Sequence, residues 1–331
     1  MQVIAKSVNE MLQIDAARET ERIVATMREQ VQRKLRRKGV VLGLSGGIDS
    51  SVVAALCVRA FGPRNVLGLL MPEHDSSSDS ELLGRLLGDH LGMESILENI
   101  GPTLEAAGCY ARRNEAVRSV VPDFQPTDRF KIVLPSLLDG SPYRIHYVVV
   151  EFADGRQVKA RLPLDAYQTI VASTNFKQRV RKMMEFYHGD RLRYAVAGTP
   201  NRLEYDQGFF VKNGDGAADF KPIAHLYKTQ VYQLADYLEI PEIIRHRPPT
   251  TDTYSLEQSQ EEFFFSVPYH KLDACLYAKN HGILAEEITD AVGLPVEHVE
   301  RVFRDIDAKR QATAYLHTYP LLVDPVSEIR H

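Results

Sequence analysis

Cysteine is scarce in this sequence of 331 residues. Only Cys57, Cys109 and Cys275 occur, and no two of them stand in a C-x-x-C spacing. Small disulfide-stapled domains and zinc sites need more cysteines, at closer and regular spacings. The sequence therefore predicts neither, and it favours reduced thiols in a cytoplasmic protein.

Long apolar runs and a strong charge imbalance are also missing. The stretch from Met1 to Ala16 mixes charged and apolar residues, and nothing approaches the ~18 consecutive apolar residues of a membrane-spanning helix. The formal net charge is only -4, which gives no overall attraction to nucleic acid or to an anionic membrane. We expect a folded cytoplasmic protein with neither partner, which binds any phosphate through local groups.

Short apolar runs alternate with helical patterns along much of the chain. Such alternation predicts a doubly wound, mostly parallel α/β sheet of the Rossmann-like kind, with ligands bound beyond the carboxyl ends of its strands. The region after Ile240 is expected to be mostly helical. The strands are expected over residues 40–44, 66–71, 95–100 and 192–197, and the helices over 20–37, 49–61, 80–91, 103–117, 175–188 and 228–238.

The pattern changes between residues 119 and 173. Five prolines punctuate this stretch, and two strand-like runs, 143–152 and 157–162, flank Asp154-Gly155. An Asp-Gly pair between two such runs is typical of a β-hairpin. We interpret 119–173 as a β-rich insertion within one domain that spans 1–331, placed over the site or at a subunit contact.

A glycine-rich turn, Ser45-Gly46-Gly47-Ile48-Asp49-Ser50-Ser51, joins the first predicted strand to a helix. Backbone N–H groups and a helix N-terminus converge on an anion at such a place. The turn lacks the Gly-Lys-Ser/Thr ending of a Walker A loop, which disfavours transfer of a γ-phosphate. S-G-G-x-D-S resembles the signature of N-type ATP pyrophosphatases. That resemblance implies an adenine nucleotide alpha-hydrolase-like fold and cleavage of ATP between its α- and β-phosphates.

Several families share this turn, and three other stretches distinguish them. Residues 198–204 (G-T-P-N-R-L-E), 208–219 (G-F-F-V-K-N-G-D-G-A-A-D), Pro222 and Lys228 resemble the NAD synthetase family in order and spacing. Asn175-x-x-x-Arg179 on a basic helix and Pro249-Thr250-Thr251-Asp252 resemble two further elements of that family. The resemblance covers nearly the whole chain except the insertion.

The resemblance implies an AMP-forming carbon–nitrogen ligase, an ammonia-dependent enzyme of NAD biosynthesis that uses ATP, deamido-NAD, ammonia and Mg²⁺ and acts as a homodimer. A carboxylate pair is the usual protein ligand set for Mg²⁺ that carries phosphate, and a lysine neutralises a leaving pyrophosphate. The implied catalytic residues are Asp49, Asp215, Lys228 and Thr250, and the implied metal ligands are Asp49 and Glu204. The implied ATP contacts are Gly43, Ser45, Gly46, Gly47, Asp49, Ser50, Ser51, Met71, Thr199, Lys228 and Thr250, and the implied contacts to the acid substrate are Asn175, Arg179, Lys212, Asp219 and Lys309.

Two departures fall near the acid substrate. Gln260 stands where the family has aspartate, and Ala308 stands where it has histidine. The chain has no room for an extra domain of roughly 250 residues that would hydrolyse glutamine, so free ammonia is the expected nitrogen source, with a separate glutaminase subunit left open. A different carboxylic acid as substrate, or a catalytically silent nucleotide-binding protein, are the alternatives. The helix at 20–37 is one candidate dimer surface.

Overall fold

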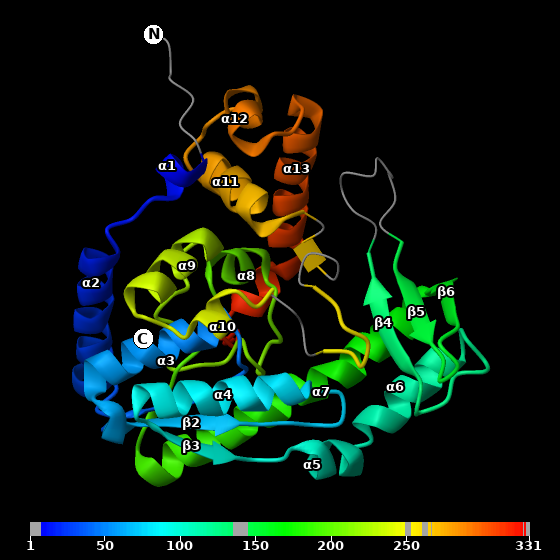
Figure 1. The fold of residues 1–331 in the computed structure, drawn as a ribbon, viewed down its shortest axis with the longest axis horizontal. Coiled ribbons are helices and arrows are strands. Elements are labelled where there is room, and N and C mark those ends of the chain that lie inside the picture. The colour runs from blue at the N-terminus through cyan, green and yellow to red at the C-terminus, as the bar shows by residue number, and fades with distance from the viewer. Residues whose placement is uncertain are drawn as a thin grey trace.

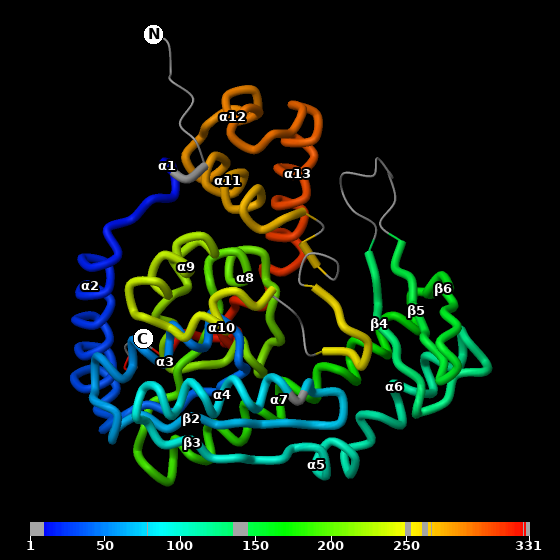
Figure 2. Tube along the Cα trace, viewed as in Figure 1, coloured from blue at the N-terminus to red at the C-terminus, as the bar shows by residue number. Residues whose placement is uncertain are grey.

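The computed structural model describes residues 8–134, 145–248, 253–259, 264–265, 267–326 and 328. A parallel sheet with helices on both faces is joined to a cluster of C-terminal helices and to a small antiparallel sheet (Figures 1 and 2). The strands are β1 (Val40–Gly43), β2 (Val66–Leu70), β3 (Glu94–Leu97), β4 (Arg129–Val133), β5 (Tyr147–Glu151), β6 (Gln157–Arg161) and β7 (Ala195–Val196). The helices are α1 (Val8–Leu12), α2 (Ala16–Arg28), α3 (Ile48–Phe61), α4 (Ser78–Leu91), α5 (Gly101–Ala106), α6 (Cys109–Arg118), α7 (Leu164–Leu192), α8 (Arg202–Gln207), α9 (Lys228–Tyr237), α10 (Glu242–Arg245), α11 (Tyr269–Asn280), α12 (Ala285–Val292) and α13 (Val296–Thr313).

The larger sheet has the strand order β3-β2-β1-β7, and all its pairs are parallel. In the central strand, Val41 pairs with Leu67 on one side and with Val196 on the other. The strands β1 and β2 are buried on both faces, as continuous apolar runs require, whereas the edge strand β3 is partly exposed. The predicted α/β class with a mostly parallel sheet is confirmed. The last strand is shorter than the predicted 192–197, because Leu192 still belongs to α7 and Arg193 ends that helix in a left-handed conformation.

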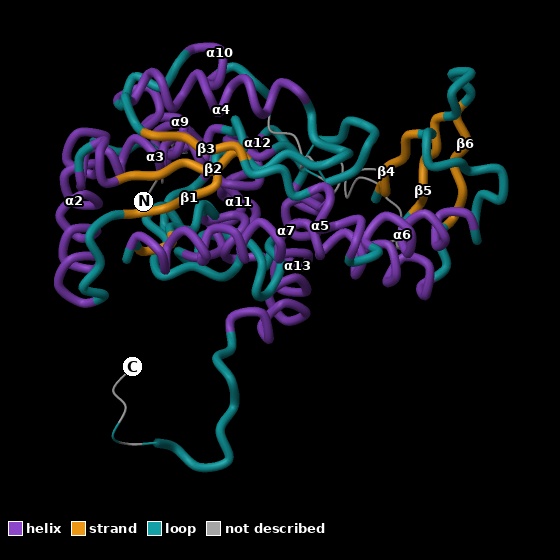
Figure 3. The backbone as a smooth tube through the Cα atoms, turned by 90° about the horizontal axis from the view of Figure 1, so that it is seen from below, coloured by secondary structure: helices purple, strands orange, loops and turns teal. Residues whose placement is uncertain are grey.

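Alternate residues of each strand face different helices. Val40 and Leu42 pack with α3 in one core cluster, whereas Val41 and Leu69 pack with α5, α6 and α7 in another. The view from below shows the sheet between these helix layers (Figure 3). On α2, Ile23 and Met27 are buried against α3. The apolar face of this segment is therefore buried within the chain at Ile23, Met27 and Val31, whereas Leu35 near its end is exposed.

Two predicted helices have different limits in the structure. The expected helix at 103–117 is divided into α5 and α6, because Gly108 takes a positive φ of 70° between them. The expected helix at 20–37 begins earlier, where the Asp15 side chain accepts a hydrogen bond from the amide of Arg18 at 3.0 Å. It continues beyond α2 as a π-helical stretch, Glu29–Lys34.

The small sheet has the order β4-β5-β6 and is antiparallel. Its β5–β6 hairpin turns at Asp154-Gly155, where Gly155 has a φ of 84°. The predicted hairpin is thus present, although residues 143 and 144 lie outside the described part. The strand β4 was not predicted. Phe130 of β4 and Val150 of β5 are buried against Ile170 of α7, so this sheet packs on the first turns of the same helix that underlies the parallel sheet.

The C-terminal region is helical, as predicted, and α11, α12 and α13 share a core with Leu12 of α1. A 3₁₀ turn, Ala314–His317, follows α13. Beyond this turn the chain extends away from the folded body as an exposed tail without regular secondary structure (Figure 3), in which Val323 is 100% exposed. None of the helices described is long and apolar enough to span a bilayer.

Candidate active site

A cavity of about 530 Å³ opens at the carboxyl ends of the parallel strands. Gly43 ends β1, Met71 directly follows β2, and Ala197 directly follows β7, and all three line this cavity. The edge where parallel strands end is where ligands bind in such sheets. The structure brings most of the predicted site residues to this one cavity: Gly43, Ser45, Gly47, Asp49, Ser50, Met71, Asn175, Arg179, Thr199, Glu204, Lys212, Asp215 and Lys228.

The glycine-rich turn forms one end of the cavity. Gly46 has a φ of 71°, and a Cβ built there would lie 3.0 Å from the Ser80 carbonyl oxygen, so only glycine fits without strain. Gly47 precedes the first residue of α3 and provides no side chain to cap it. The hydroxyls of Ser50 and Ser51 donate to the Gly47 carbonyl at 3.0 and 2.9 Å, which fixes the turn. The uncapped N-terminus of a 14-residue helix thus faces the cavity, as an anion site requires.

Two carboxylates meet beside this turn, and Asn201 connects them. The Asn201 side-chain amide donates to Asp49 Oδ1 at 3.0 Å, while its backbone amide donates to Glu204 Oε2 at 3.1 Å. Asn201 is also the N-cap of α8, since its Oδ1 accepts from the amide of Leu203 at 2.9 Å. Our reading of the sequence did not single out Asn201. The N-x-x-E spacing of a capping box was the signal that could have identified it.

Lys228 completes this group from the first turn of α9. Its ammonium is hydrogen-bonded to Asp49 Oδ2, and the residue is only 2% exposed. A cation at a helix N-terminus is unfavourable for the helix dipole. The buried Asp273 of α11 offsets this, because its carboxylate accepts from the amides of Lys228 at 3.2 Å and Thr229 at 2.7 Å. Burial raises the pKa of Asp273 to about 6.

The carboxylate pair has the electrostatics of a cation site. Burial, and next the negative charge of Asp49, raise the pKa of Glu204 to about 8, while Lys228 lowers it. Two carboxylates that oppose each other's ionisation stabilise a divalent cation once both are charged. Within the described residues no group of three or more His, Cys, Asp or Glu side chains could hold a metal. Two carboxylates are a ligand set that Mg²⁺ commonly takes, with water and phosphate oxygens to complete its shell.

Helix α7 presents a polar stripe to the cavity. Tyr167, Val171, Thr174, Gln178, Arg181 and Glu185 line it at spacings of three and four residues, which is the repeat of one helix face. Deep in this stripe, Lys182 Nζ donates to Glu185 Oε2 at 2.6 Å, and both side chains are buried. Burial raises the pKa of Glu185, and Lys182 opposes this shift. Sequence reasoning placed only Asn175 and Arg179 of this helix at the site, because charged residues on a helix are usually solvated.

The C-terminal turn closes one side of the cavity. Tyr315 and Leu316 line it, and the ammonium of Lys212 donates to the carbonyls of Tyr315 at 2.7 Å and Thr318 at 3.2 Å. Asp215 also lines the cavity; its carboxylate accepts from the amide of Val211 at 2.8 Å, and burial raises its pKa. Lys212 thus lies at the cavity, with its ammonium bound to the carbonyls of the C-terminal turn.

Some predicted site residues do not line the cavity. Ser51 is buried under the turn, and Gly46 shapes it from behind. Asp219 accepts a hydrogen bond from the amide of Val196 at 2.7 Å, which holds the end of β7. Lys309 pairs with Asp305 at 3.0 Å and donates to the carbonyl of Phe264 at 2.9 Å. Asp219 and Lys309 thus make these contacts within the chain, and their contacts to the acid substrate stay a prediction. Thr250 and Gln260 lie outside the described residues.

Comparison with known proteins identifies relatives of this chain. The model of the NAD synthase family matches residues 19–132 and 142–313. An NH(3)-dependent NAD(+) synthetase from Rhizobium meliloti (strain 1021) is 59% identical over 318 residues, which cover 96% of this chain and 95% of that protein. The fold is similar to that of an NMN synthetase from Francisella tularensis, with a TM-score of 0.63 and 22% identity over 94% of this chain and 99% of the other. It is also similar to an NH3-dependent NAD synthetase from Campylobacter jejuni subsp. jejuni, with a TM-score of 0.61 and 24% identity over 94% and 100% of the two chains.

The interruption in the family match, at 133–141, begins at the last residue of β4 and ends before β5, so that both strands of the β5–β6 hairpin lie inside a matched stretch. The two similar structures are below 25% identical to this chain, so they support the fold alone. The family match covers most of the chain, and the relative of 59% identity extends over nearly all of it. On these grounds the chain belongs to the NAD synthase family.

Proposed function

We propose that the protein converts deamido-NAD to NAD by ATP-dependent amidation with ammonia, through an acyl-adenylate, and that it releases AMP and pyrophosphate. The observation that carries this proposal is the meeting of Asp49, Glu204 and Lys228 beside the uncapped N-terminus of α3. This combination can bind a phosphate chain and its cation. The turn lacks the Gly-Lys-Ser/Thr ending with which a Walker A loop supports transfer of a γ-phosphate. Relatives named NH(3)-dependent NAD(+) synthetase support the choice of acid and nitrogen source.

The roles follow from the charges. The amides of the turn and the Lys228 ammonium stabilise the negative charge that develops on the leaving pyrophosphate. Asp49 and Glu204 would hold Mg²⁺, which when bound neutralises phosphate charge. Asp215 is buried in the wall, and its raised pKa makes it our candidate for taking up the proton that ammonium loses before it attacks. The stripe on α7, with Asn175 and Arg179, would bind the acid substrate.

We also propose a cytoplasmic homodimer supplied with free ammonia. The three cysteines are buried and unbridged, which suits a reducing compartment. The relative from Rhizobium meliloti is named NH(3)-dependent, and this chain covers 95% of it. A separate glutaminase subunit is the alternative source of nitrogen.

The test is formation of AMP and pyrophosphate from Mg-ATP and ammonium. Deamido-NAD is compared with other acids, among them the deamidated form of nicotinamide mononucleotide. Turnover that is specific to deamido-NAD supports the proposal, whereas turnover with only another acid keeps the chemistry and overturns the substrate. Asp49→Asn is the control and should be inactive, because it removes one charge of the carboxylate pair. Absence of turnover with every acid would favour a silent nucleotide-binding protein.

A further inference from the structure

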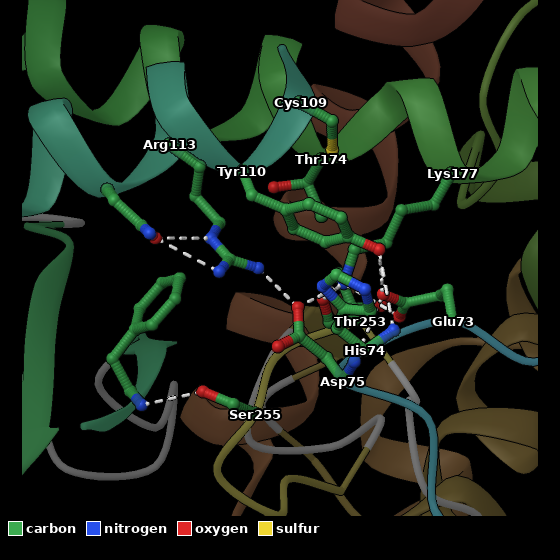
Figure 4. A network of polar contacts seen from close by, with 12 residues as sticks. Glu73, His74, Asp75, Cys109, Tyr110, Arg113, Thr174, Lys177, Thr253 and Ser255 are labelled. Atoms are coloured by element: carbon green, nitrogen blue, oxygen red, sulfur yellow. Dashed lines mark hydrogen bonds and ion pairs between the residues drawn. The ribbon is translucent and has the colours of Figure 1, made fainter. Parts of the chain in front are cut away.

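Four charged side chains are buried together outside the group of residues around Asp49. Lys177 of α7 is 1% exposed, and Arg113 of α6 is 5% exposed. Their partners are Glu73 and Asp75, in the loop that follows β2. Figure 4 shows Lys177 and Arg113 reaching from two helices towards these two carboxylates. We call these four residues the buried charge cluster.

Lys177 joins two separate parts of the chain. Its ammonium nitrogen lies 2.6 Å from Asp75 Oδ2, 3.0 Å from Glu73 Oε1 and 2.9 Å from the backbone carbonyl oxygen of Thr253. The ammonium donates hydrogen bonds to Asp75 Oδ2 and to the Thr253 carbonyl, and its contact with Glu73 Oε1 is an ion pair. Lys177 is among the residues that line the cavity, but its charged end is engaged with these oxygens of its neighbours.

Both parts that Lys177 joins form walls of the cavity. Ser76 and Ser77 line it directly after Asp75, and Thr253 and Tyr254 line it on the other part. The loop after β2 is fixed further, since the Tyr110 hydroxyl donates to Glu73 Oε2 at 2.8 Å. The second part is fixed against the small sheet, where the amide of Leu256 donates to the carbonyl of Phe130 at 3.1 Å. Lys177 is the direct link between these two anchored walls.

Stability alone does not account for the cluster. Buried ion pairs are often no more stabilising than apolar side chains of the same volume, because the charges lose their hydration. Charged hydrogen bonds instead fix direction and distance, which apolar packing does less strictly. A small misplacement of the groups around a reacting centre can lower the rate about a hundredfold. Strict placement of two walls is thus a function that the cluster can serve.

We propose that Lys177 is a positioning residue for the amide-forming reaction, which sets the distance between the wall at Ser76–Ser77 and the wall at Thr253–Tyr254. It acts through Glu73, Asp75 and the Thr253 carbonyl and does not itself touch the substrates. The kinetic part of the proposal rests on the proposed function, whereas the structural link does not. The two can therefore be tested separately.

The experiment compares the full-length parent with Lys177→Met and with the double variant Lys177→Met/Glu73→Gln. The single variant leaves a buried carboxylate without its cation and is expected to be less stable. The double variant restores the balance of charge but leaves the Thr253 carbonyl without the ammonium. Lys159→Met, on the exposed side of β6, is the matched control. Thermal unfolding shows which variants are folded at the assay temperature.

The first measurement is hydrogen exchange at the amide of Leu256, which requires no substrate. In the double variant we expect exchange about tenfold faster than in the parent, while Lys159→Met is unchanged. The second is steady-state kinetics, where we expect kcat of the double variant to fall about tenfold or more, with KM for ATP within about threefold because the turn and Lys228 are untouched. Unchanged exchange at Leu256, or a kcat restored to the parent value once charge balance is restored, would overturn the proposal. A parent that turns over no acid refutes the proposed function alone, since the exchange measurement still decides the link.

Discussion

Replacement of Asn201 by alanine separates the two tasks that this side chain performs. Asn201 caps α8 through its Oδ1 and orients Asp49 through its amide group. Loss of an N-cap costs about 1 kcal/mol of stability, within a range of about 0.5–2. A hydrogen bond to a charged group contributes about 1.5–3 kcal/mol more. We therefore expect Asn201→Ala to lower the free energy of unfolding by about 2–4 kcal/mol.

Asn201→Ser is the matched variant. Serine is a good N-cap, but its side chain is too short to reach Asp49, so it keeps the first contribution and loses the second. The serine variant should be about 1 kcal/mol more stable than the alanine variant. Both variants should lose about tenfold or more in kcat/KM for Mg-ATP, because Asp49 is no longer held beside Glu204, and tenfold corresponds to about 1.4 kcal/mol.

Urea unfolding followed by circular dichroism gives the stabilities, since the chain has no tryptophan to report by fluorescence. Pyrophosphate release gives the activities. Equal stability of the two variants would refute the capping role. Full activity of Asn201→Ser would refute the claim that Asn201 orients Asp49 for catalysis.

Three further predictions concern charge and the chain end. The pKa of Glu204 is raised to about 8, so Mg²⁺ must displace a proton to bind below that pH. The apparent affinity for Mg²⁺ should therefore rise with pH by up to about tenfold per unit between pH 6.5 and 8. An Mg²⁺ affinity that does not change with pH, or a pH dependence that Glu204→Gln does not alter, would contradict this. The pKa of Asp273 is raised from 3.8 to about 6, so its carboxyl group favours folding at low pH, and this contribution is lost as the pH rises through 6. The stability of the parent relative to Asp273→Asn should fall by up to about 3 kcal/mol between pH 4 and 7. A constant difference between the two in urea unfolding would show that the pKa is normal. A chain ended after Thr318 should keep the parent KM for the acid, because the Lys212 contacts remain, whereas one ended after Thr313 should raise it about tenfold; equal values in steady-state assays would show that the C-terminal turn is not part of the site.

The parts of the molecule that short stretches of sequence determine were predicted correctly. The turn at Ser45 to Ser51 needs a strand before it, a helix after it and glycine where φ is positive, and all of these are visible in neighbouring residues. The same holds for the β5–β6 hairpin around Asp154-Gly155. The carboxylate pair of Asp49 and Glu204, separated by more than 150 positions, came from the family resemblance and not from the pattern.

What could not be predicted depends on contacts between distant residues. In the sequence, Glu73 and Lys177 each look like a solvent-exposed charged residue. Only the packing of α7 against the loop after β2 shows that they are buried partners. The strand β4 does alternate, with Arg129 and Lys131 between the buried Phe130 and Ile132, but its five residues are too short a run to stand out in a proline-rich stretch. Lys309 was predicted to contact the substrate from its position in a motif, whereas its packing between the rings of Phe264 and Phe265 and its ion pair with Asp305 could not be foreseen from the sequence.

The length of α7 has a consequence for how this protein can evolve. Its 29 residues extend about 43 Å at 1.5 Å each, from the small antiparallel sheet to the underside of the parallel one. One inserted or deleted residue would rotate everything beyond it by about 100°, which would turn either Ile170 out of its core or Glu185 away from the cavity. Insertions and deletions should therefore be absent from residues 164–192 in relatives and should collect in connections such as the one between β4 and β5. The length of this helix should stay constant while its surface residues vary.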